Sequence, residues 1–379
     1  MAHIVHIARA YPPAVGGVER VVEFLADTAR SGGHDVTIIC AVEKGQPARS
    51  TTRTGVVVER LPAWFYVGVM PISPGLPRAI SKILATADIV HFHEPYPLAT
   101  LWLVLLPRPR RLVITWHADI YRQKYLKPYA EWLQHRLASR ADAIFCTTQR
   151  MASTSPFLQR HLTQVKIMPF MIDMAPFDAL RDDPERHEET RRRWGGRYIL
   201  GFGRLVEYKG FGVLIDALAG TDMRAVIVGK GWLEADLKQQ ARERGVADQV
   251  VFAGAVDDET ARDLYFACEF FAFPSIHNEG FGIVQLEAMA AGRPVINTWL
   301  PTSVPDVSLD GVTGLTVPPY DVGALRAAML RLWTNTELRE RLATAALARV
   351  REHFESKRVA SRVLSVYDDV LAASPRVAG

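Results

Sequence analysis

Short β-rich apolar runs alternate with amphipathic stretches of helical period, and this alternation limits the fold more than any other feature of the sequence. Strands that are regularly separated by helices are typical of a parallel sheet covered by helices on both faces. In the first half the apolar runs lie at His3–Ala8, Asp35–Cys40, Val56–Leu61, Ile89–His93, Leu112–His117, Ala143–Thr147 and Val165–Met168. After a polar stretch at Pro176–Glu189 they resume at Tyr198–Gly203, Ala225–Gly229, Val250–Ala253, Phe270–Phe273, Pro294–Asn297 and Leu315–Val317.

The interruption of this pattern predicts two domains. We expect an α/β fold in which two doubly wound, Rossmann-like domains face each other across a cleft. Residues 1–180 would form the first domain and residues 181–355 the second, with a last helix at about 356–379 crossing back to the first. Ligands of such sheets bind beyond the carboxyl ends of the strands, so the cleft is the expected site.

Composition excludes several other classes of protein. Of the 379 residues 49% are hydrophobic and 23% charged, which is enough apolar material for two cores. The longest apolar run, Leu98–Leu106, is too short to span a bilayer, and no signal-peptide pattern precedes the first strand, so we expect a cytoplasmic protein. Cys40, Cys146 and Cys268 are far apart and lie in apolar patterns, which argues against disulfides and against a zinc site.

Charge is distributed unevenly along the chain. Residues 1–180 contain 20 Lys and Arg against 13 Asp and Glu, a balance of +7, whereas residues 181–379 contain 25 against 28, a balance of −3. A basic half fits an anionic partner such as a phosphorylated ligand or an acidic lipid surface, although a solvated surface accounts for it equally well. The charges do not form a stripe interleaved with aromatic residues, so we expect no nucleic-acid partner.

The loop after the first strand contains Gly16 and Gly17 and leads into a helix that starts near Val18. Paired glycines let the backbone approach a ligand closely, and the free amides of a helix start favour negative charge. This combination suits a phosphate or a sugar hydroxyl. A tight strand–helix turn requires the same glycines, so both interpretations stay open.

Two cations follow the first strand of the second domain. Arg204 and Lys209 come directly after Gly203, at the carboxyl end of the strand, where both could bind a diphosphate. Exposed surface charge is the alternative for such a pair taken alone. The next strand is followed by Gly229 and Lys230, but neither domain has the complete glycine fingerprint of a dinucleotide site, so an oxidoreductase is not supported.

The most specific stretch of the sequence contains two glutamates. Glu279 precedes a turn, Gly280-Phe281-Gly282, whose amides continue to Ile283 at the start of a helix and could bind phosphate oxygens. Glu287 lies about two helical turns further on, close to the same face, so the two carboxylates could bind two sets of hydroxyls. The alternatives are a helix N-terminal acid for Glu279 and a partly buried ion pair for Glu287.

Histidines end two strands of the first domain. His117, in the sequence Trp-His-Ala-Asp, could act as a general acid or base or contact a sugar hydroxyl. His91 and His93 could suggest a metal pair, but no third ligand is evident, so we interpret them as structural. The chain contains no Asp-x-Asp sequence, and we expect no metal.

These residues resemble the retaining nucleotide-sugar glycosyltransferases of family 4, which have the GT-B fold. The resemblance covers essentially the whole chain, and its most specific part is Glu279 together with Glu287–Ile296, EAMAAGRPVI. The segment Trp116–Lys124 and the length look most like bacterial polysaccharide mannosyltransferases that use GDP-mannose, although related enzymes that use UDP-sugars share much of this sequence. One departure is Ala118, where related sequences often have another small polar residue.

The resemblance implies roles for these residues. Arg204 and Lys209 would neutralise the donor diphosphate in place of a metal, Glu279 would hold the transferred sugar, and Glu287 would hold the ribose hydroxyls. His117 would contact the sugar, and it would form the catalytic group with Arg204, Lys209 and Glu279. The residues that would bind the donor are Gly16, Gly17, Gly203, Arg204, Lys209, Gly229, Lys230, Val256, Glu279, Gly280, Phe281, Gly282, Ile283 and Glu287.

The implied reaction is retaining, metal-independent transfer of mannose from GDP-mannose to a lipid-linked or oligosaccharide acceptor in cell-surface polysaccharide synthesis. The alternatives are a UDP-sugar-dependent transferase of the same family and a sugar-nucleotide epimerase. Arg108, Arg110 and Arg111 beside Leu98–Leu106, with Trp64-Phe65-Tyr66, would suit a lipid diphosphate acceptor at an anionic membrane. A buried helix followed by a solvated turn is the other interpretation of that region.

Overall fold

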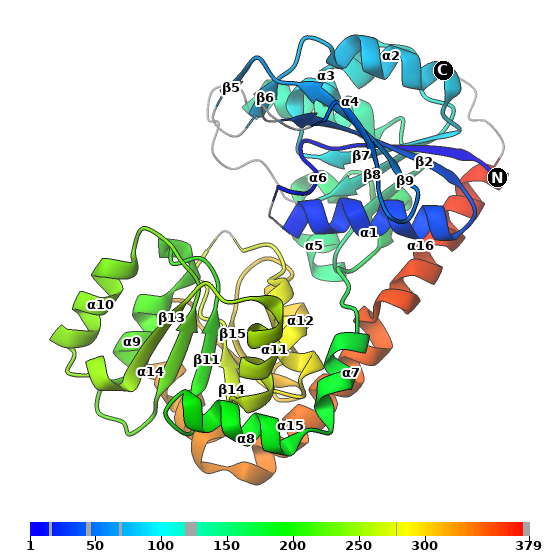
Figure 1. Cartoon of the computed structure of the whole chain (residues 1–379). Helices are drawn as coiled ribbons and strands as arrows, with labels where there is room; N and C mark the ends of the chain where they lie inside the picture. Colours follow the sequence, from blue (N-terminus) through cyan, green and yellow to red (C-terminus); the bar gives the residue numbers. More distant parts are fainter. Residues whose placement is uncertain (15–16, 43–46, 68–69, 118–126, 278, 374–379) are drawn as a thin grey trace. The chain divides into compact units, whose positions relative to one another are not determined.

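The computed structural model describes the chain except for residues 15–16, 43–46, 68–69, 118–126, 278 and 374–379 (Figure 1). The chain divides into two compact units. Unit 1 comprises Met1–Pro169 and Val359–Gly379, and unit 2 comprises Phe170–Arg358. From the sequence we placed the division near residues 180 and 356. The first division lies earlier in the structure because the side chains of Phe170 and Phe177 pack in a core of unit 2.

Unit 1 is built on an eight-stranded sheet in the order β10-β9-β8-β7-β1-β2-β4-β3. All neighbouring strands are parallel except β3 and β4. The strands are β1 (His3–Ile7), β2 (Asp35–Val42), β3 (Arg49–Thr51), β4 (Val57–Pro62), β7 (Ile89–Glu94), β8 (Leu112–Trp116), β9 (Ala143–Cys146) and β10 (Val165–Ile167). A separate antiparallel hairpin is formed by β5 (Phe65–Val67) and β6 (Met70–Ile72).

Helices cover both faces of this sheet (Figure 1). One face carries α2, α3 and α4, which form a core with Phe92, Ile114 and other side chains of the strands. The opposite face carries α1 and α16, and Tyr367 of α16 bonds to His91 of β7. The helices are α1 (Gly17–Ser31), α2 (Leu76–Thr86), α3 (Pro97–Leu105), α4 (Lys127–Ala138), α5 (Gln149–Thr154), α6 (Pro156–Gln159) and α16 (Ser356–Ala372). A C-terminal helix that returns to the first domain was predicted from the sequence.

Unit 2 is built on a six-stranded parallel sheet in the order β13-β12-β11-β14-β15-β16. The strands are β11 (Ile199–Phe202), β12 (Ala225–Val228), β13 (Val250–Gly254), β14 (Phe270–Ala272), β15 (Val295–Thr298) and β16 (Gly314–Val317). The helices are α7 (Ala175–Arg181), α8 (Pro184–Arg193), α9 (Phe211–Leu218), α10 (Glu234–Glu243), α11 (Asp258–Ala267), α12 (Ile283–Ala290), α13 (Val304–Val307), α14 (Val322–Thr334) and α15 (Thr336–Arg349). Two doubly wound sheets, parallel except for the β3–β4 pair of unit 1, confirm the predicted α/β fold class.

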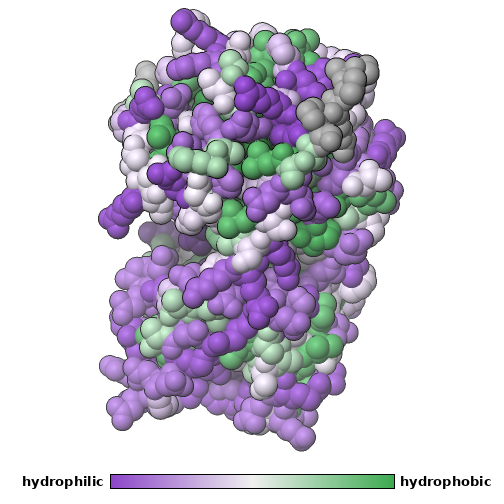
Figure 2. Space-filling model, turned by 90° about the vertical axis from the view of Figure 1, so that its right-hand side faces the viewer, coloured by the Kyte–Doolittle hydropathy of each residue, from purple (hydrophilic) through white to green (hydrophobic). Residues whose placement is uncertain are grey.

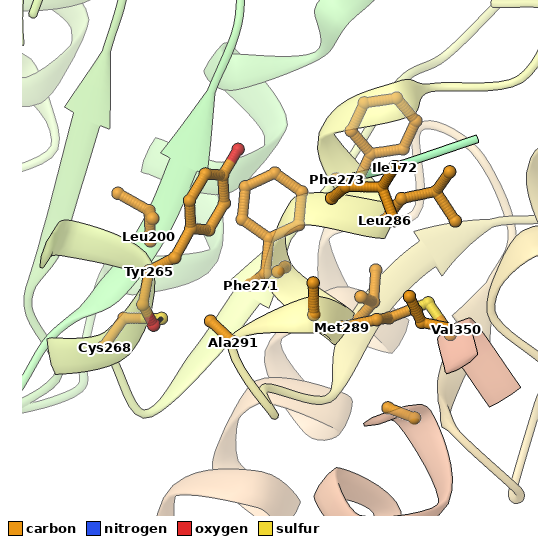
Figure 3. Close-up of a cluster of buried hydrophobic side chains, with 14 of the residues drawn as sticks. Ile172, Leu200, Tyr265, Cys268, Phe271, Phe273, Leu286, Met289, Ala291 and Val350 are labelled. Carbon is orange, nitrogen blue, oxygen red and sulfur yellow. Dashed lines mark hydrogen bonds between the residues drawn. The ribbon is translucent and has the colours of Figure 1, made fainter. Parts of the chain in front are cut away.

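Alternating side chains of the unit 2 strands enter two different cores. On β11, Ile199 packs with α9 and α14, whereas Leu200 packs with α11 and α12. Figure 3 shows part of the second core, where Leu200, Tyr265, Phe271 and Met289 form a continuous apolar cluster. This period of two is what a strand buried on both faces requires.

The first and last segments of unit 2 lie side by side. The backbone N–H of Ile172 donates to the carbonyl oxygen of Phe354 at 2.9 Å, and Ser356 N–H donates to the carbonyl oxygen of Ile172 at 2.9 Å. Ile172 and Glu355 thereby form a parallel bridge. The chain therefore enters and leaves unit 2 at one place.

The surface in Figure 2 is largely hydrophilic, with hydrophobic residues scattered among polar ones. Within the described ranges, no helix has the length and apolar character that crossing a membrane requires. The apolar run Leu98–Leu106 forms most of α3, whose Leu103 and Val104 are buried in the core of unit 1. The three cysteines are buried and unpaired by disulfides.

Candidate active site

Unit 2 has a topological switch point between β11 and β14. The chain winds outward through β12 and β13 on one side of β11, and through β14, β15 and β16 on the other. Loops that follow the two central strands diverge at such a point and leave a crevice where ligands of open α/β sheets bind. The loop after β11 carries Arg204 and Lys209, and the loop after β14 carries Glu279. Arg204, Lys209 and Glu279 therefore lie on the two loops that flank the switch point.

Lys209 and Glu279 form an ion pair that joins these two loops. Their side chains are only 12% and 14% exposed. The Lys209 ammonium lies 5.1 Å from the centre of the Phe273 ring and 5.5 Å from that of Tyr208, and Ser275 donates to Glu279 at 3.4 Å. The cation predicted for the diphosphate and the acid predicted for the sugar are thus held together in a partly desolvated place.

Gly210 sets the spacing of the two loops. It has φ = 69°, and it caps α9 directly after Lys209. A Cβ at this position would lie 1.9 Å from the carbonyl oxygen of Pro274. Beside this contact, the backbone N–H of Ile276 donates to the carbonyl oxygen of Tyr208 at 2.8 Å. The loops touch backbone to backbone, and only glycine permits both the conformation and the approach.

Arg204 is exposed and is oriented by Tyr208. Its Nη2 donates to the Tyr208 hydroxyl at 2.8 Å, and the guanidinium carbon lies 5.9 Å from the centre of the ring. Both predicted cations therefore contact the same aromatic side chain, which was not predicted from the sequence. The position of Tyr208 in the loop between Arg204 and Lys209 was the signal in the sequence that could have indicated this role.

The glycines that follow β11 and β12 have a structural role. Gly229 has φ = 137°, and a Cβ on it would lie 1.9 Å from the carbonyl oxygen of Gly203. The Gly203 N–H donates to the carbonyl oxygen of Val228 at 2.9 Å, so the two strand ends cross in close contact. Lys230 is exposed beside them, and Val256 is partly buried against the core.

The turn at residues 280–282 leads into α12. Gly282 is the N-cap residue with φ = 77°, and no side chain among the described residues caps this helix end. Phe281 is buried and its ring lies 4.9 Å from that of Phe170, so it anchors the turn in the core. The Gly280 carbonyl oxygen accepts from Ser303 N–H at 2.9 Å. The amides at Ile283 lie at a helix start that favours an anion.

Glu287 is oriented by a hydroxyl from the neighbouring helix. Its Oε2 accepts a hydrogen bond from Tyr265 of α11 at 2.8 Å. Figure 3 shows the Tyr265 ring in the apolar cluster with its hydroxyl pointing away from it. The bond fixes one carboxylate oxygen of a half-buried glutamate. Tyr265 was not predicted from the sequence, because its partner lies on another helix.

His117 directly follows β8 in unit 1 and is buried. Its Nε2 lies 3.2 Å from Nδ1 of His93. Burial, followed by the positive charge of Arg9, lowers the pKa of His117 to about 3. The imidazole is therefore neutral at neutral pH, and protonation to an acid is disfavoured.

His6, His91 and His93 bring ring nitrogens within 4.8 Å of one another. The third histidine of this group, His6, lies on β1, far along the chain from His91 and His93, so the sequence spacing did not reveal it. The rings of His91 and His93 stack at 10°, and both nitrogens of His91 are bonded, to Tyr367 at 2.6 Å and to Thr115 at 2.7 Å. Histidines that bind a metal each point a bare ring nitrogen, in the plane of the ring, at one shared ion. The stacked rings and the two bonded nitrogens of His91 do not fit this geometry, so we interpret the group as a hydrogen-bonded cluster.

Some predicted positions lie outside the described residues. These are Gly16 and the segment 118–126, which includes Ala118 and most of the Trp116–Lys124 sequence. Gly17 is described and is the first residue of α1. The site residues of unit 1 that the structure describes are therefore Gly17 and His117.

Two family models match the chain. The model "Glycosyltransferase Family 4" matches residues 15–157, and "Glycosyl transferases group 1" matches residues 182–349. The second range includes both cations and both glutamates of the switch-point site.

Curated relatives match over nearly the full length. The chain is 30% identical to O-antigen chain mannosyltransferase C of Escherichia coli, over 97% of this chain and 98% of the relative. It is 31% identical to D-rhamnosyltransferase WbpZ of Pseudomonas aeruginosa, over 93% and 92%. It is 28% identical to phosphatidyl-myo-inositol mannosyltransferase of Mycobacterium leprae, over 96% and 95%.

Solved structures share the fold. Anabaena HepE, crystallised with UDP and glucose, has a TM-score of 0.77 at 19% identity and covers 97% of this chain and 100% of its own. At this identity the similarity establishes the architecture alone.

Proposed function

The chain belongs to the family 4 glycosyltransferases and is a hexosyltransferase, and from this we propose that it transfers mannose from GDP-mannose to a glycan or a lipid-diphosphate-linked acceptor. We further propose that the transfer is retaining, needs no metal ion and serves cell-surface polysaccharide synthesis. Two of the relatives are named as mannosyltransferases, at 30% and 28% identity, which supports mannose. Another relative, at 31% identity, is named as a D-rhamnosyltransferase, so relatives at this identity differ in the sugar for which they are named.

The Lys209–Glu279 pair at the switch point is the observation that carries this proposal. Breaking a glycosidic bond to a diphosphate leaves negative charge on the leaving group, which fixed cations stabilise most strongly where water is partly excluded. Lys209 is such a cation, and Arg204 contacts the same Tyr208 side chain. The chain has no Asp-x-Asp sequence to bind a bridging metal. Two side-chain cations are the groups we assign to the leaving diphosphate.

In the proposed reaction the acceptor hydroxyl attacks C1 of mannose from the face that the diphosphate leaves. The new C1–O bond forms as the bond from C1 to the phosphate oxygen breaks, and the hydroxyl proton passes to that oxygen. Lys209 and Arg204 stabilise the departing charge, Glu279 accepts hydrogen bonds from the sugar, and Glu287 accepts them from the ribose. Donor binding replaces part of the Lys209–Glu279 contact, so the ion pair keeps both groups in place until the donor arrives.

Nucleotide selectivity tests the donor. The thermal unfolding of the chain is compared with GDP, UDP, ADP and dTDP at matched millimolar concentration, because a ligand at a hundred times its Kd adds about 2.7 kcal/mol to native stability. We expect stabilisation by GDP alone. Stabilisation by UDP alone would replace GDP-mannose by a UDP-sugar, and no stabilisation by any nucleotide would contradict the proposed site.

Product analysis tests the reaction type. GDP-mannose labelled with ¹³C at C1 is incubated with acceptor, and the anomeric coupling constant of the product is measured with and without EDTA. We expect the configuration of the donor and an unchanged rate with EDTA. An inverted anomer or a chelator-sensitive rate would contradict the mechanism, and conversion of the nucleotide sugar without acceptor would indicate an epimerase.

We propose that the acceptor side contacts an anionic membrane through the β5–β6 hairpin. Trp64, Phe65 and Val67 have exposed fractions of 75%, 55% and 54%, and exposed apolar side chains of this kind insert at a lipid interface. Most of the run at Leu98–Leu106 contributes to the core of unit 1, with Leu105 exposed, and Arg111 is buried. Flotation with phosphatidylglycerol vesicles should recover the chain, and Trp64→Ser with Phe65→Ser should abolish recovery. Equal recovery of both proteins would contradict contact through the hairpin.

A further inference from the structure

We infer that unit 2 has a second ligand site, an arginine-lined cavity that binds inorganic phosphate. The cavity has a volume of about 290 Å³ and is lined by α8, α15 and the segments that directly precede β14 and β15 (Figure 1). The charged residues that line it are Arg191, Glu269, Arg293, Arg339 and Glu340. The inference goes beyond the proposed transfer reaction and does not depend on it.

The cavity lies at the edge of the sheet opposite to the switch-point site. Glu269 directly precedes β14 and Pro294 directly precedes β15, so both mark the amino ends of their strands. Lys209 and Glu279 instead follow the carboxyl ends of β11 and β14. In a parallel sheet these ends form opposite edges, and even the three-residue strand β14 spans about 10 Å. The cavity is therefore separate from the site that we assign to the sugar donor.

Arg293 is a partly buried cation without a carboxylate partner among the described residues. Its Nη2 donates to the carbonyl oxygen of Phe266, and its Nε is fully buried and has no hydrogen-bond partner in the described part of the chain. Burial lowers the pKa of Arg293, and the charge of Arg191 lowers it further. A guanidinium does not lose its proton in proteins, so a cation in this place needs an anion to compensate for its burial.

The carboxylates that line the cavity do not supply this compensation. Both oxygens of Glu269 accept from Arg197, at 3.1 and 3.4 Å, and Arg339 pairs with one of them at 3.1 Å. Glu340 is exposed on α15 and forms no ion pair with a described residue. The acids of the lining are therefore either bound by other arginines or turned to solvent, and Arg293 is left over.

Arg191 adds a second unused donor group to the cavity. Its side chain is 28% exposed, and its Nη1 pairs with Glu188 at 2.7 Å. Its Nε donates to the carbonyl oxygen of Ala267 at 3.3 Å. No described residue accepts from Nη2 of Arg191 or from Nη1 of Arg293. Two terminal guanidinium nitrogens on different elements thus remain available for one anion.

Free phosphate is the anion that these observations favour. Guanidinium groups bind phosphate oxygens in pairs, and a tetrahedral phosphate offers oxygens to several donors at once. The volume lies at the lower end of the range for small-molecule pockets, which suits a small anion better than a nucleotide sugar. Neither α8 nor α15, both described throughout, exposes a large apolar side chain, so a lipid surface is not indicated.

Calorimetric titration with potassium phosphate tests the site without any sugar donor. Ionic strength is held constant with potassium chloride. We expect Arg293→Met to weaken phosphate binding by about 10- to 100-fold, the range that loss of charge-assisted hydrogen bonds produces. Arg192→Gln is the matched control, because this exposed neighbour on α8 loses the same charge and does not line the cavity. It should change the Kd by less than about twofold.

Two further variants determine where the phosphate binds. Lys209→Met removes a cation of the switch-point site and should leave the affinity unchanged, whereas loss of phosphate binding in this variant alone would move the anion to the switch point. Glu340→Gln removes a negative charge from the lining and should tighten binding by up to about fivefold, the factor typical of an exposed charge pair. Weaker binding by Glu340→Gln would contradict an anion in the cavity.

Arg191→Gln keeps the test decisive if Arg293→Met does not fold. Arg191 is partly exposed, so its replacement is tolerated more easily, and we expect phosphate binding to weaken about tenfold. Equal affinity of Arg191→Gln and Arg192→Gln for phosphate would overturn the proposal, as would the absence of saturable binding by the wild type. These results are independent of mannose transfer, and a chain without transferase activity that binds phosphate in this way would contradict only the proposed function.

Discussion

Lys209 is restrained on several sides before any donor binds. The Glu279 carboxylate pairs with its ammonium group, and the rings of Phe273 and Tyr208 lie 5.1 Å and 5.5 Å away. Ordering a long side chain costs conformational entropy, which here is lost on folding and not during catalysis. The positive charge of Lys209 is therefore already in place when negative charge develops on the leaving diphosphate.

Replacement of this charge should affect turnover far more than folding. We expect Lys209→Met to lower kcat by about 10²- to 10³-fold, the loss typical of removing one group that stabilises developing charge. Lys238→Met, which breaks an exposed ion pair with Glu234 on α10, is the control and should change kcat little. Steady-state rates with unfolding curves for both variants make the comparison. Similar rates for the two variants would remove Lys209 from the mechanism.

Glu269 is a second buried carboxylate, and it serves stability. It accepts from Arg197 at 3.1 Å and pairs with Arg339 at 3.1 Å. We expect Glu269→Gln to lower the free energy of unfolding by about 1.5–3 kcal/mol, since it weakens charge-assisted bonds in a buried place. Glu259→Gln breaks an exposed pair with Arg186 and should cost less than about 1 kcal/mol. Urea denaturation of both variants measures the two losses of unfolding free energy.

The contribution of Glu269 should depend on pH. Burial opposes ionisation of this carboxyl, but the Arg197 bond and the charges of Arg339 and Arg197 outweigh it, so its pKa lies below the usual value near 4.5. A lowered carboxyl pKa gives stability that is present above about pH 4.5 and lost as the pH falls through the folded-state value. The difference between wild type and Glu269→Gln should therefore shrink in acid, and a difference that grows would contradict this assignment.

At the scale of elements, α9 has glycines of similar conformation at its two ends. Gly210, with φ = 69°, touches the Pro274 carbonyl oxygen, whereas Gly220, with φ = 77°, has no described atom within 4 Å of the position that a Cβ would take. Both Gly→Ala changes should cost about 1–2 kcal/mol from backbone strain. Gly210→Ala must in addition separate the loops of Lys209 and Glu279, so only it should lose most of kcat. Equal kcat values for the two variants would show that the loop contact is unimportant.

The buried parallel strands were the elements that the sequence predicted best. Each expected apolar run, such as Ala225–Gly229 or Leu112–His117, overlaps a strand, because burial on both faces demands a continuous β-rich run. The three-residue strands β3, β5 and β6 were not predicted, since so short a segment has no measurable period. Tyr208 and His6 were missed for another reason. Their importance depends on partners brought close by loop contact or by strand register, which spacing along one segment does not reveal.

At the scale of the whole molecule, Tyr367 connects the last helix to the first sheet. Its hydroxyl lies 2.6 Å from His91 Nδ1, and both groups are buried. We expect Tyr367→Phe to destabilise unit 1 by about 1–3 kcal/mol, because it leaves a buried ring nitrogen without a partner. Tyr129→Phe, at an exposed position on α4, should be neutral. Hydrogen exchange should show faster opening of β7 and unchanged β11, whereas equal changes in both would contradict a local role.

The return of α16 to the first sheet also dictates an order of events during synthesis. Unit 2 is one continuous segment whose ends meet at Ile172 and Glu355, so it can complete its core while translation continues. His91 must wait for 276 further residues before Tyr367 leaves the ribosome. Unit 1, whose first residues are synthesised before unit 2, therefore completes its fold only after unit 2 has been synthesised. A nascent chain halted before residue 367 lacks the hydroxyl that bonds to His91, so the face of the first sheet that α1 and α16 share is only partly covered until synthesis is nearly complete.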